Sequence, residues 1–186
     1  MTIMTLTDEL IRCGIKENSS IIHFGAGHKN GQFLVDMYNS FKSNSISPNY
    51  VGVEAEESKV KSTIDLLLKN EVPSVYQNIT NISMQDYIVD NNHQYDHAII
   101  TGIFDKSLYG ETQFQFIHSI INELFKFVNE SVLFTYNSSD HQEETYNIHY
   151  MNGYVQSNYS RYSVVRINEH EYLYCINKYY LPYNNI

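Results

Sequence analysis

The feature that most restricts the fold of this chain is a regular alternation of short β-branched or apolar runs with longer amphipathic segments. The short runs predict strands at 19–24, 50–54, 73–79, 95–100 and 131–136. Apolar residues at helical spacing predict helices at 6–15, 32–42, 56–70, 84–89 and 112–128. Alternation of this kind favours a parallel sheet with helices on both faces, so we expect the α/β class.

The pattern changes after the fifth predicted strand. The polar stretch 137–147 is compatible with a loop or a helix, and two β-rich runs follow at 161–167 and 171–176. The three residues between these runs suit an antiparallel hairpin. We therefore expect a three-layer sandwich with a mostly parallel seven-stranded sheet and a C-terminal antiparallel hairpin near one edge. At 186 residues without a linker or repeat, the chain predicts one domain, 1–186.

Charge and composition restrict the partners. The net charge is −9 and only three arginines occur, so the basic patch expected of a nucleic-acid-binding protein is not visible and a nucleic-acid partner is disfavoured. No apolar run reaches the roughly 18 residues that suggest a membrane span, and the first residues lack the pattern of a signal peptide. Two cysteines are too few for a disulfide framework or zinc cluster. We expect a cytoplasmic protein with reduced thiols and no membrane contact; no pattern specifies its oligomeric state.

Two features at predicted strand ends point to a ligand. Gly25 and Gly27 directly follow the first strand, where they allow a tight turn and close approach of a ligand to the backbone. Glu54 closes the second strand, where a carboxylate is placed to accept hydrogen bonds from both ribose hydroxyls of an adenosine-containing cofactor. Ligands of open α/β sheets bind outside the carboxyl ends of the strands, so the two features together favour an adenosyl ligand.

The loop also bears on which adenosyl ligand is bound. A dinucleotide fingerprint needs a third glycine at position 30, but the residue is Asn30, and glycine arrives only at Gly31. A Walker lysine–serine pair is absent from the sequence as well. These departures disfavour NAD and nucleoside triphosphates and favour a ligand without a pyrophosphate.

Five motifs then carry a family resemblance: IIHFGAG, YVGVEAEE, YDHAIITGIF, SVLFTY and the closing SRYSVVRINEHEYLYCINK. Over 19–178 the chain resembles the class I S-adenosylmethionine-dependent methyltransferases, which implies a Rossmann-like fold and S-adenosylmethionine as cofactor. By this resemblance the glycine loop lies against the amino-acid part of the cofactor, Glu54 holds the ribose, and the segment after the third strand packs around the adenine. The residues that the resemblance places at the cofactor are Gly25, Ala26, Gly27, Glu54, Ser83, Met84, Thr101 and Gly102.

The chain departs from the family at two places, one just before the glycine loop and one directly after it. The family usually has an acid at the position of His23, where it orients the amino-acid part of the cofactor; here we expect a half-buried, structural histidine that still belongs to the cofactor site. The segment 28–31 is also longer than usual.

The predicted reaction is methyl transfer to a small polar molecule such as a sugar or another metabolite, because no further domain is present to recognise a macromolecule. Two alternatives remain: a binding or scaffold protein that keeps the fold without catalysis, and methylation of RNA or protein. A hydroxyl acceptor needs a general base, and His141 and His149 after the fifth strand are the candidates, although both also fit solvated loop residues. We expect no metal. The tyrosines that crowd the chain after residue 145 fit an aromatic acceptor pocket, an interface or mere compositional bias.

Overall fold

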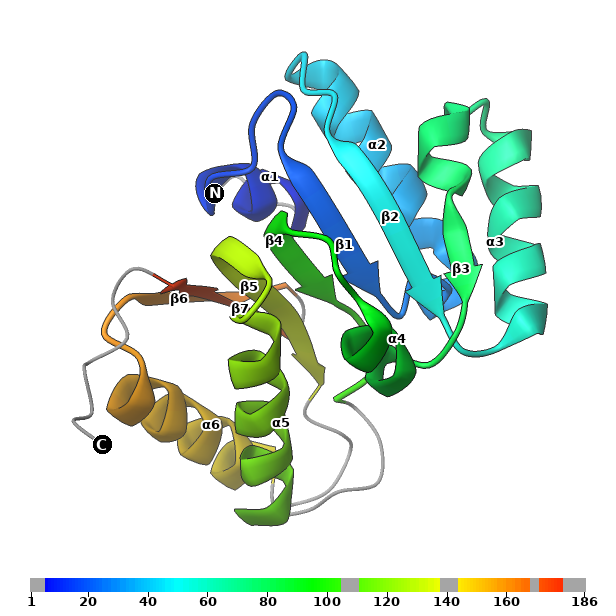
Figure 1. The fold of residues 1–186 in the computed structure, drawn as a ribbon. Helices are drawn as coiled ribbons and strands as arrows, with labels where there is room; N and C mark the ends of the chain where they lie inside the picture. The colour runs from blue at the N-terminus through cyan, green and yellow to red at the C-terminus, as the bar shows by residue number, and fades with distance from the viewer. Residues whose placement is uncertain (1–5, 105–110, 138–143, 168–170, 179–186) are drawn as a thin grey trace.

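A single mixed sheet organises the chain. The computed structural model describes residues 6–104, 111–137, 144–167 and 171–178, and within them a seven-stranded sheet has the order β3-β2-β1-β4-β5-β7-β6 (Figure 1). The strands are β1 (Ser20–Phe24), β2 (Asn49–Glu54), β3 (Ile79–Asn81), β4 (Tyr95–Ile100), β5 (Val128–Asn137), β6 (Tyr162–Arg166) and β7 (Glu171–Asn177). The first five strands pair in parallel, and β7 runs antiparallel to both β5 and β6. The predicted α/β fold class and terminal hairpin are confirmed.

Helices cover both faces of this sheet. They are α1 (Leu6–Arg12), α2 (Gln32–Ser43), α3 (Glu57–Lys69), α4 (Met84–Asp90), α5 (Glu111–Leu124) and α6 (Glu144–Asn158), with short 3-10 turns η1 (His28–Gly31) and η2 (Ser74–Gln77). Side chains of α1, α2 and α3 share one apolar layer, and those of α4, α5 and α6 share the other. Because successive strand residues point to opposite faces, Ile21 enters the first layer and Ile22 the second. The architecture is therefore a three-layer sandwich.

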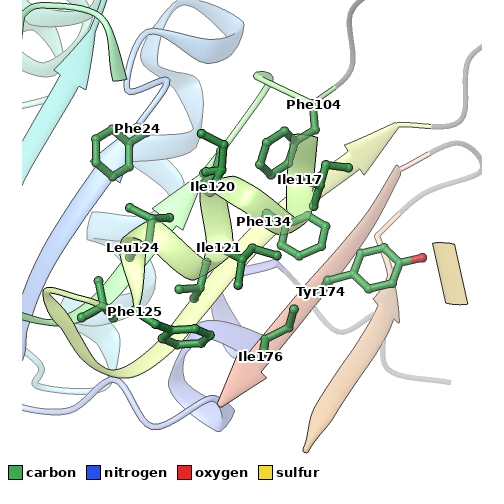
Figure 2. Close-up of a cluster of buried hydrophobic side chains, with 14 of the residues drawn as sticks. Phe24, Phe104, Ile117, Ile120, Ile121, Leu124, Phe125, Phe134, Tyr174 and Ile176 are labelled. Carbon is green, nitrogen blue, oxygen red and sulfur yellow. The ribbon is translucent and has the colours of Figure 1, made fainter. Parts of the chain in front are cut away.

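The helix α5 shows how the sequence pattern becomes packing. Its residues Ile117, Ile121 and Leu124 recur at helical spacing, and all three are fully buried. Figure 2 shows them in one cluster with Phe134 of β5 and Tyr174 of β7, whose rings stack at 5.0 Å. This cluster fixes the antiparallel hairpin to the parallel part of the sheet.

Two predicted elements are wrong in type or extent. The expected strand at 73–79 is largely the turn η2, with the three-residue strand β3 after it. Pro73 starts this turn and Tyr76 buries its ring within it, so tertiary packing overrides the β-branched pattern. The expected helix at 112–128 ends at Leu124, because Val128 already pairs with Tyr95 in the sheet.

The polar stretch 137–147, for which the sequence allowed a loop or a helix, is helical from Glu144 onward. Helix α6 begins at Glu144 and continues to Asn158, through Gly153, which lies in open space. No helix in the described part of the chain is both long and apolar enough to cross a membrane.

Candidate cofactor-binding site

A pocket of about 460 Å³ opens at the carboxyl ends of β1, β2 and β4. The chain runs from β1 to β2 and β3 on one side and returns with β4 on the other side of β1, so strand order reverses here (Figure 1). Ligands of open α/β sheets bind at such a reversal. The pocket is lined by Gly25, Gly27, His28, Lys29, Asn30, Val53, Glu54, Ala55, Glu56, Lys59, Ile82, Ser83, Met84, Gln85, Thr101, Gly102 and Ile103.

The floor of the pocket is a backbone turn that only glycine allows. Gly25 has φ +77°, and a Cβ added there would lie 2.0 Å from the carbonyl oxygen of Thr101. A Cβ on Gly27 would lie 2.6 Å from Cβ of Lys59 and 2.8 Å from Oε2 of Glu54. The two glycines therefore let β1, β4 and the start of α3 approach closely and leave backbone, without side chains, facing the pocket.

Glu54 ties this turn to the end of β2. Its Oε2 accepts a hydrogen bond of 3.0 Å from the backbone N–H of Gly27, and its Oε1 accepts one of 3.0 Å from the N–H of Glu56. The residue is 8% exposed yet lines the pocket. Each carboxylate oxygen has two lone-pair directions, so Glu54 retains acceptor capacity for a ligand hydroxyl while its orientation is fixed by the backbone.

His23 lies beneath the glycine turn, and the expectation of a half-buried side chain is wrong: its exposed fraction is zero. Thr101 Oγ1 donates to the carbonyl oxygen of Gly25 at 3.0 Å, so His23 Nε2–H donates to Thr101 Oγ1 at 2.7 Å. Its Nδ1 then accepts from the Tyr50 hydroxyl at 2.9 Å. Burial, helped by the charge of nearby His28, lowers the pKa of His23 to about 3. A neutral histidine thus positions the loop through Thr101.

The loop after the glycines leaves regular geometry. Lys29 and Asn30 both have positive φ, 51° and 54°, and Gly31 follows at φ 84°. Lys29 Nζ reaches Glu171 Oε2 on β7 at 2.8 Å, so this loop bridges from the pocket to the antiparallel hairpin. The segment 28–31 therefore builds a link across the carboxyl edge of the sheet.

Part of the pocket lining is apolar. It consists of Val53 at the end of β2, Ile82 after β3 and Met84, which opens α4. Ser83 caps that helix, because its hydroxyl accepts from the N–H of Asp86 at 3.1 Å. An apolar wall with a fixed helix start suits a planar aromatic group such as adenine.

The structure brings together most of the residues predicted at the cofactor. Seven of them line the pocket, namely Gly25, Gly27, Glu54, Ser83, Met84, Thr101 and Gly102. Ala26 is buried in the core layer of α2, and His23 supports the loop from below. The sequence reasoning missed Lys59, which lies on the first turn of α3, and Ile82, which lies between β3 and α4.

His149, one of the two predicted general bases, is not among the described residues that line this pocket. His149 lies exposed on α6 and lines a separate groove with Phe114, Tyr150 and Tyr154. His141 lies outside the described residues. A catalytic role for either histidine stays a prediction. Phe114 stacks on Tyr150 and Tyr154 at 6.4 and 5.7 Å, so these late tyrosines hold α5 against α6.

Comparison with known proteins places the fold. No protein-family model matches the sequence, and no curated protein matches it. Among solved structures, the chain is similar to a magnesium protoporphyrin IX methyltransferase from Synechocystis PCC 6803 with bound S-adenosylmethionine (11% identity, 93% of this chain and 76% of that chain covered, TM-score 0.61). It is also similar to a putative rRNA methylase from Clostridium thermocellum (12% identity, 96% of this chain and 100% of that chain covered, TM-score 0.60). A third similar structure is a precorrin 8W decarboxylase from Methanobacterium thermoautotrophicum (9% identity, 91% of this chain and 87% of that chain covered, TM-score 0.54).

These similarities, together with the strand order and the antiparallel β7, show which fold the chain has. The chain has the Rossmann-like fold of the class I S-adenosylmethionine-dependent methyltransferases. The names of the similar structures include methylases with different substrates and a decarboxylase, so these similarities indicate neither one activity nor one substrate.

Proposed function

We propose that this chain binds S-adenosylmethionine in the pocket at the carboxyl ends of β1, β2 and β4 and transfers its methyl group to a small polar molecule. One observation carries the proposal: Glu54 is held by two backbone N–H groups beside a glycine cradle that side chains would fill. The cofactor supplies an activated methyl group on a sulfonium, so the protein has mainly to orient it and an acceptor.

The lining residues fit the three parts of such a cofactor. Glu54 accepts hydrogen bonds from the ribose hydroxyls, and the apolar wall at Ile82 and Met84 packs against the adenine. The turn at Gly25 and Gly27 lets the amino-acid part approach the backbone. Gly102 and Ile103 at the end of β4 line the side of the pocket from which an acceptor enters.

The charge of the chain supports a small acceptor over a nucleic acid. The chain carries 21 acidic and 12 basic residues. Of the lysines at the pocket, Lys59 pairs with Glu56 at 2.5 Å and Lys29 with Glu171 at 2.8 Å. Their charge is thus balanced by acids, which disfavours a phosphate backbone as partner. The net negative charge of the chain would repel a phosphate backbone, but it would not repel an uncharged polar acceptor.

Calorimetric titration tests cofactor binding. We expect S-adenosylmethionine and S-adenosylhomocysteine to bind at micromolar concentration and Glu54→Gln to weaken both about tenfold, the ~1.4 kcal/mol of a good hydrogen bond. Glu57→Gln is the matched control, because Glu57 begins α3 three residues later with a side chain that is 69% exposed and paired with Lys61. It should leave affinity unchanged. No heat with folded wild-type protein, or equal weakening by both variants, rejects the site.

A binding protein without catalysis is the second candidate, and His23 is the observation that favours it. A fully buried, neutral histidine replaces the charge that the family usually presents at this position. Radiolabelled methyl transfer from S-adenosylmethionine to fractionated small metabolites separates the two functions. Label in a small-molecule fraction supports the enzyme, whereas tight cofactor binding with no transfer to metabolites, RNA or protein supports the binding role.

A further inference from the structure

The two cysteines of the chain meet far from the cofactor pocket. A second pocket of about 510 Å³ lies near the start of β5, at the opposite edge of the sheet, and both Cys13 and Cys175 line it. Cys13 follows α1 near the N-terminus, and Cys175 lies on β7 near the C-terminus. The sequence gives no hint of this contact, because the two positions are separated by nearly the whole chain.

Strand pairing explains why the two thiols are close. Cys175 is the cross-strand partner of Ser163 on β6, so the two side chains stand next to each other on one face. Cys13 Sγ lies 4.0 Å from Ser163 Oγ, which places it above the same strand pair. Cys13 also packs against the apolar layer that contains Cys175.

The thiols differ in access and environment. Cys13 is half-buried and lines an open pocket, whereas Cys175 is 1% exposed. The interaction with the Cys13 thiol, together with burial, raises the pKa of Cys175. An oxidant from solvent therefore meets Cys13 first, and Cys175 is held as a protonated thiol beside it.

A polar chain leads from Cys175 toward solvent. The Ser131 hydroxyl lies against the Cys175 thiol and bonds to His97 Nδ1 at 2.8 Å. His97 Nε2 faces Glu130 Oε2 at 3.5 Å, and that carboxylate is 36% exposed. The buried thiol therefore has polar groups beside it, a hydroxyl and an imidazole, as well as apolar ones.

We propose that Cys13 and Cys175 form an intramolecular disulfide when the protein meets hydrogen peroxide. The Cys13 sulfur attacks the peroxide, the O–O bond breaks, and a sulfenic acid and one water form. The Cys175 sulfur then attacks the sulfenic sulfur, so an S–S bond forms and the S–O bond breaks. The hydroxide that leaves takes the proton of Cys175 as a second water, and two thiols are oxidised while one peroxide is reduced. The bond joins α1 to the terminal hairpin.

Thiol counting on the full-length protein tests the proposal. Purified reduced protein is treated with one to five equivalents of hydrogen peroxide, denatured, and labelled with a maleimide carrying a polymer tag. We expect two tags before oxidation and none after it, a mass lower by two hydrogens, and a cross-linked peptide containing both cysteines. Because the bond closes nearly the whole chain into a loop, the melting temperature should rise by roughly 5–15 °C, and reductant should reverse the rise.

Cys13→Ser is the control, since serine is nearly isosteric and already occurs at the neighbouring positions 131 and 163. With the same peroxide this variant should keep its one tag and its melting temperature. Retention of both tags by oxidised wild type, oxidation only to intermolecular dimers, or sulfinic acid on Cys13 beside a free Cys175 each overturns the proposal. None of these readouts depends on cofactor binding, so the disulfide and the proposed function fail independently.

Discussion

Replacing Gly25 by alanine gives the sharpest test of the glycine cradle. The residue has φ +77°, in the left-handed region, which costs a residue with a Cβ roughly 1–2 kcal/mol. The new Cβ would also lie 2.0 Å from the carbonyl oxygen of Thr101, a backbone atom that cannot rotate away as a flexible side chain would. Overpacking of this kind costs a further ~1–3 kcal/mol. We expect Gly25→Ala to lower the free energy of unfolding by about 2–5 kcal/mol.

Gly153→Ala is the matched control. Gly153 lies within α6, and a Cβ there meets no atom within 4 Å. Alanine is favoured over glycine in a helix by roughly 0.5–1 kcal/mol, so this variant should be as stable as wild type or slightly more stable. Urea denaturation followed by circular dichroism measures both. If Gly25→Ala loses less than about 1 kcal/mol, the strain and the close approach to Thr101 are not what hold the turn, and the reasoning fails.

Two further predictions concern His23 and the core. The pKa of His23 is about 3 in the folded protein and ordinarily 6.5, so between these values the unfolded chain binds the extra proton and stability falls as pH falls. Denaturation at pH 6 and pH 4.5 should show wild type losing up to about 1.4 kcal/mol per pH unit more than His23→Gln, and parallel curves would contradict a neutral buried histidine. Ile121→Ala should cost about 2–5 kcal/mol in urea unfolding, because its side chain is fully buried, whereas Leu68→Ala, at a position 57% exposed, should cost under ~1 kcal/mol; similar losses would refute the packing shown in Figure 2.

The cofactor pocket shows which site residues the local sequence pattern could predict and which it could not. The glycines after β1 and the acid that closes β2 were predictable, because a parallel strand that ends in a tight turn places its next residues at the ligand edge of the sheet. The wall at Ile82 and the lysine at position 59 were not predicted, since they reach the pocket only once β3 and α3 pack beside β2. The general base was sought after β5, but His149 turns out to line the separate groove between α5 and α6.

The sequence by itself determined the class of fold, the alternation of strands and helices, the terminal hairpin and the glycine turn with Glu54. All of these features depend on patterns that span only a few residues, and helix and strand geometry relate such patterns directly to secondary structure. Only the tertiary structure decided that Glu54 is held by the N–H of Gly27 and that His23 is buried between Tyr50 and Thr101. The meeting of the two thiols, on segments at opposite ends of the chain, was decided in the same way. Such contacts depend on which strands become neighbours, and no local period encodes that choice.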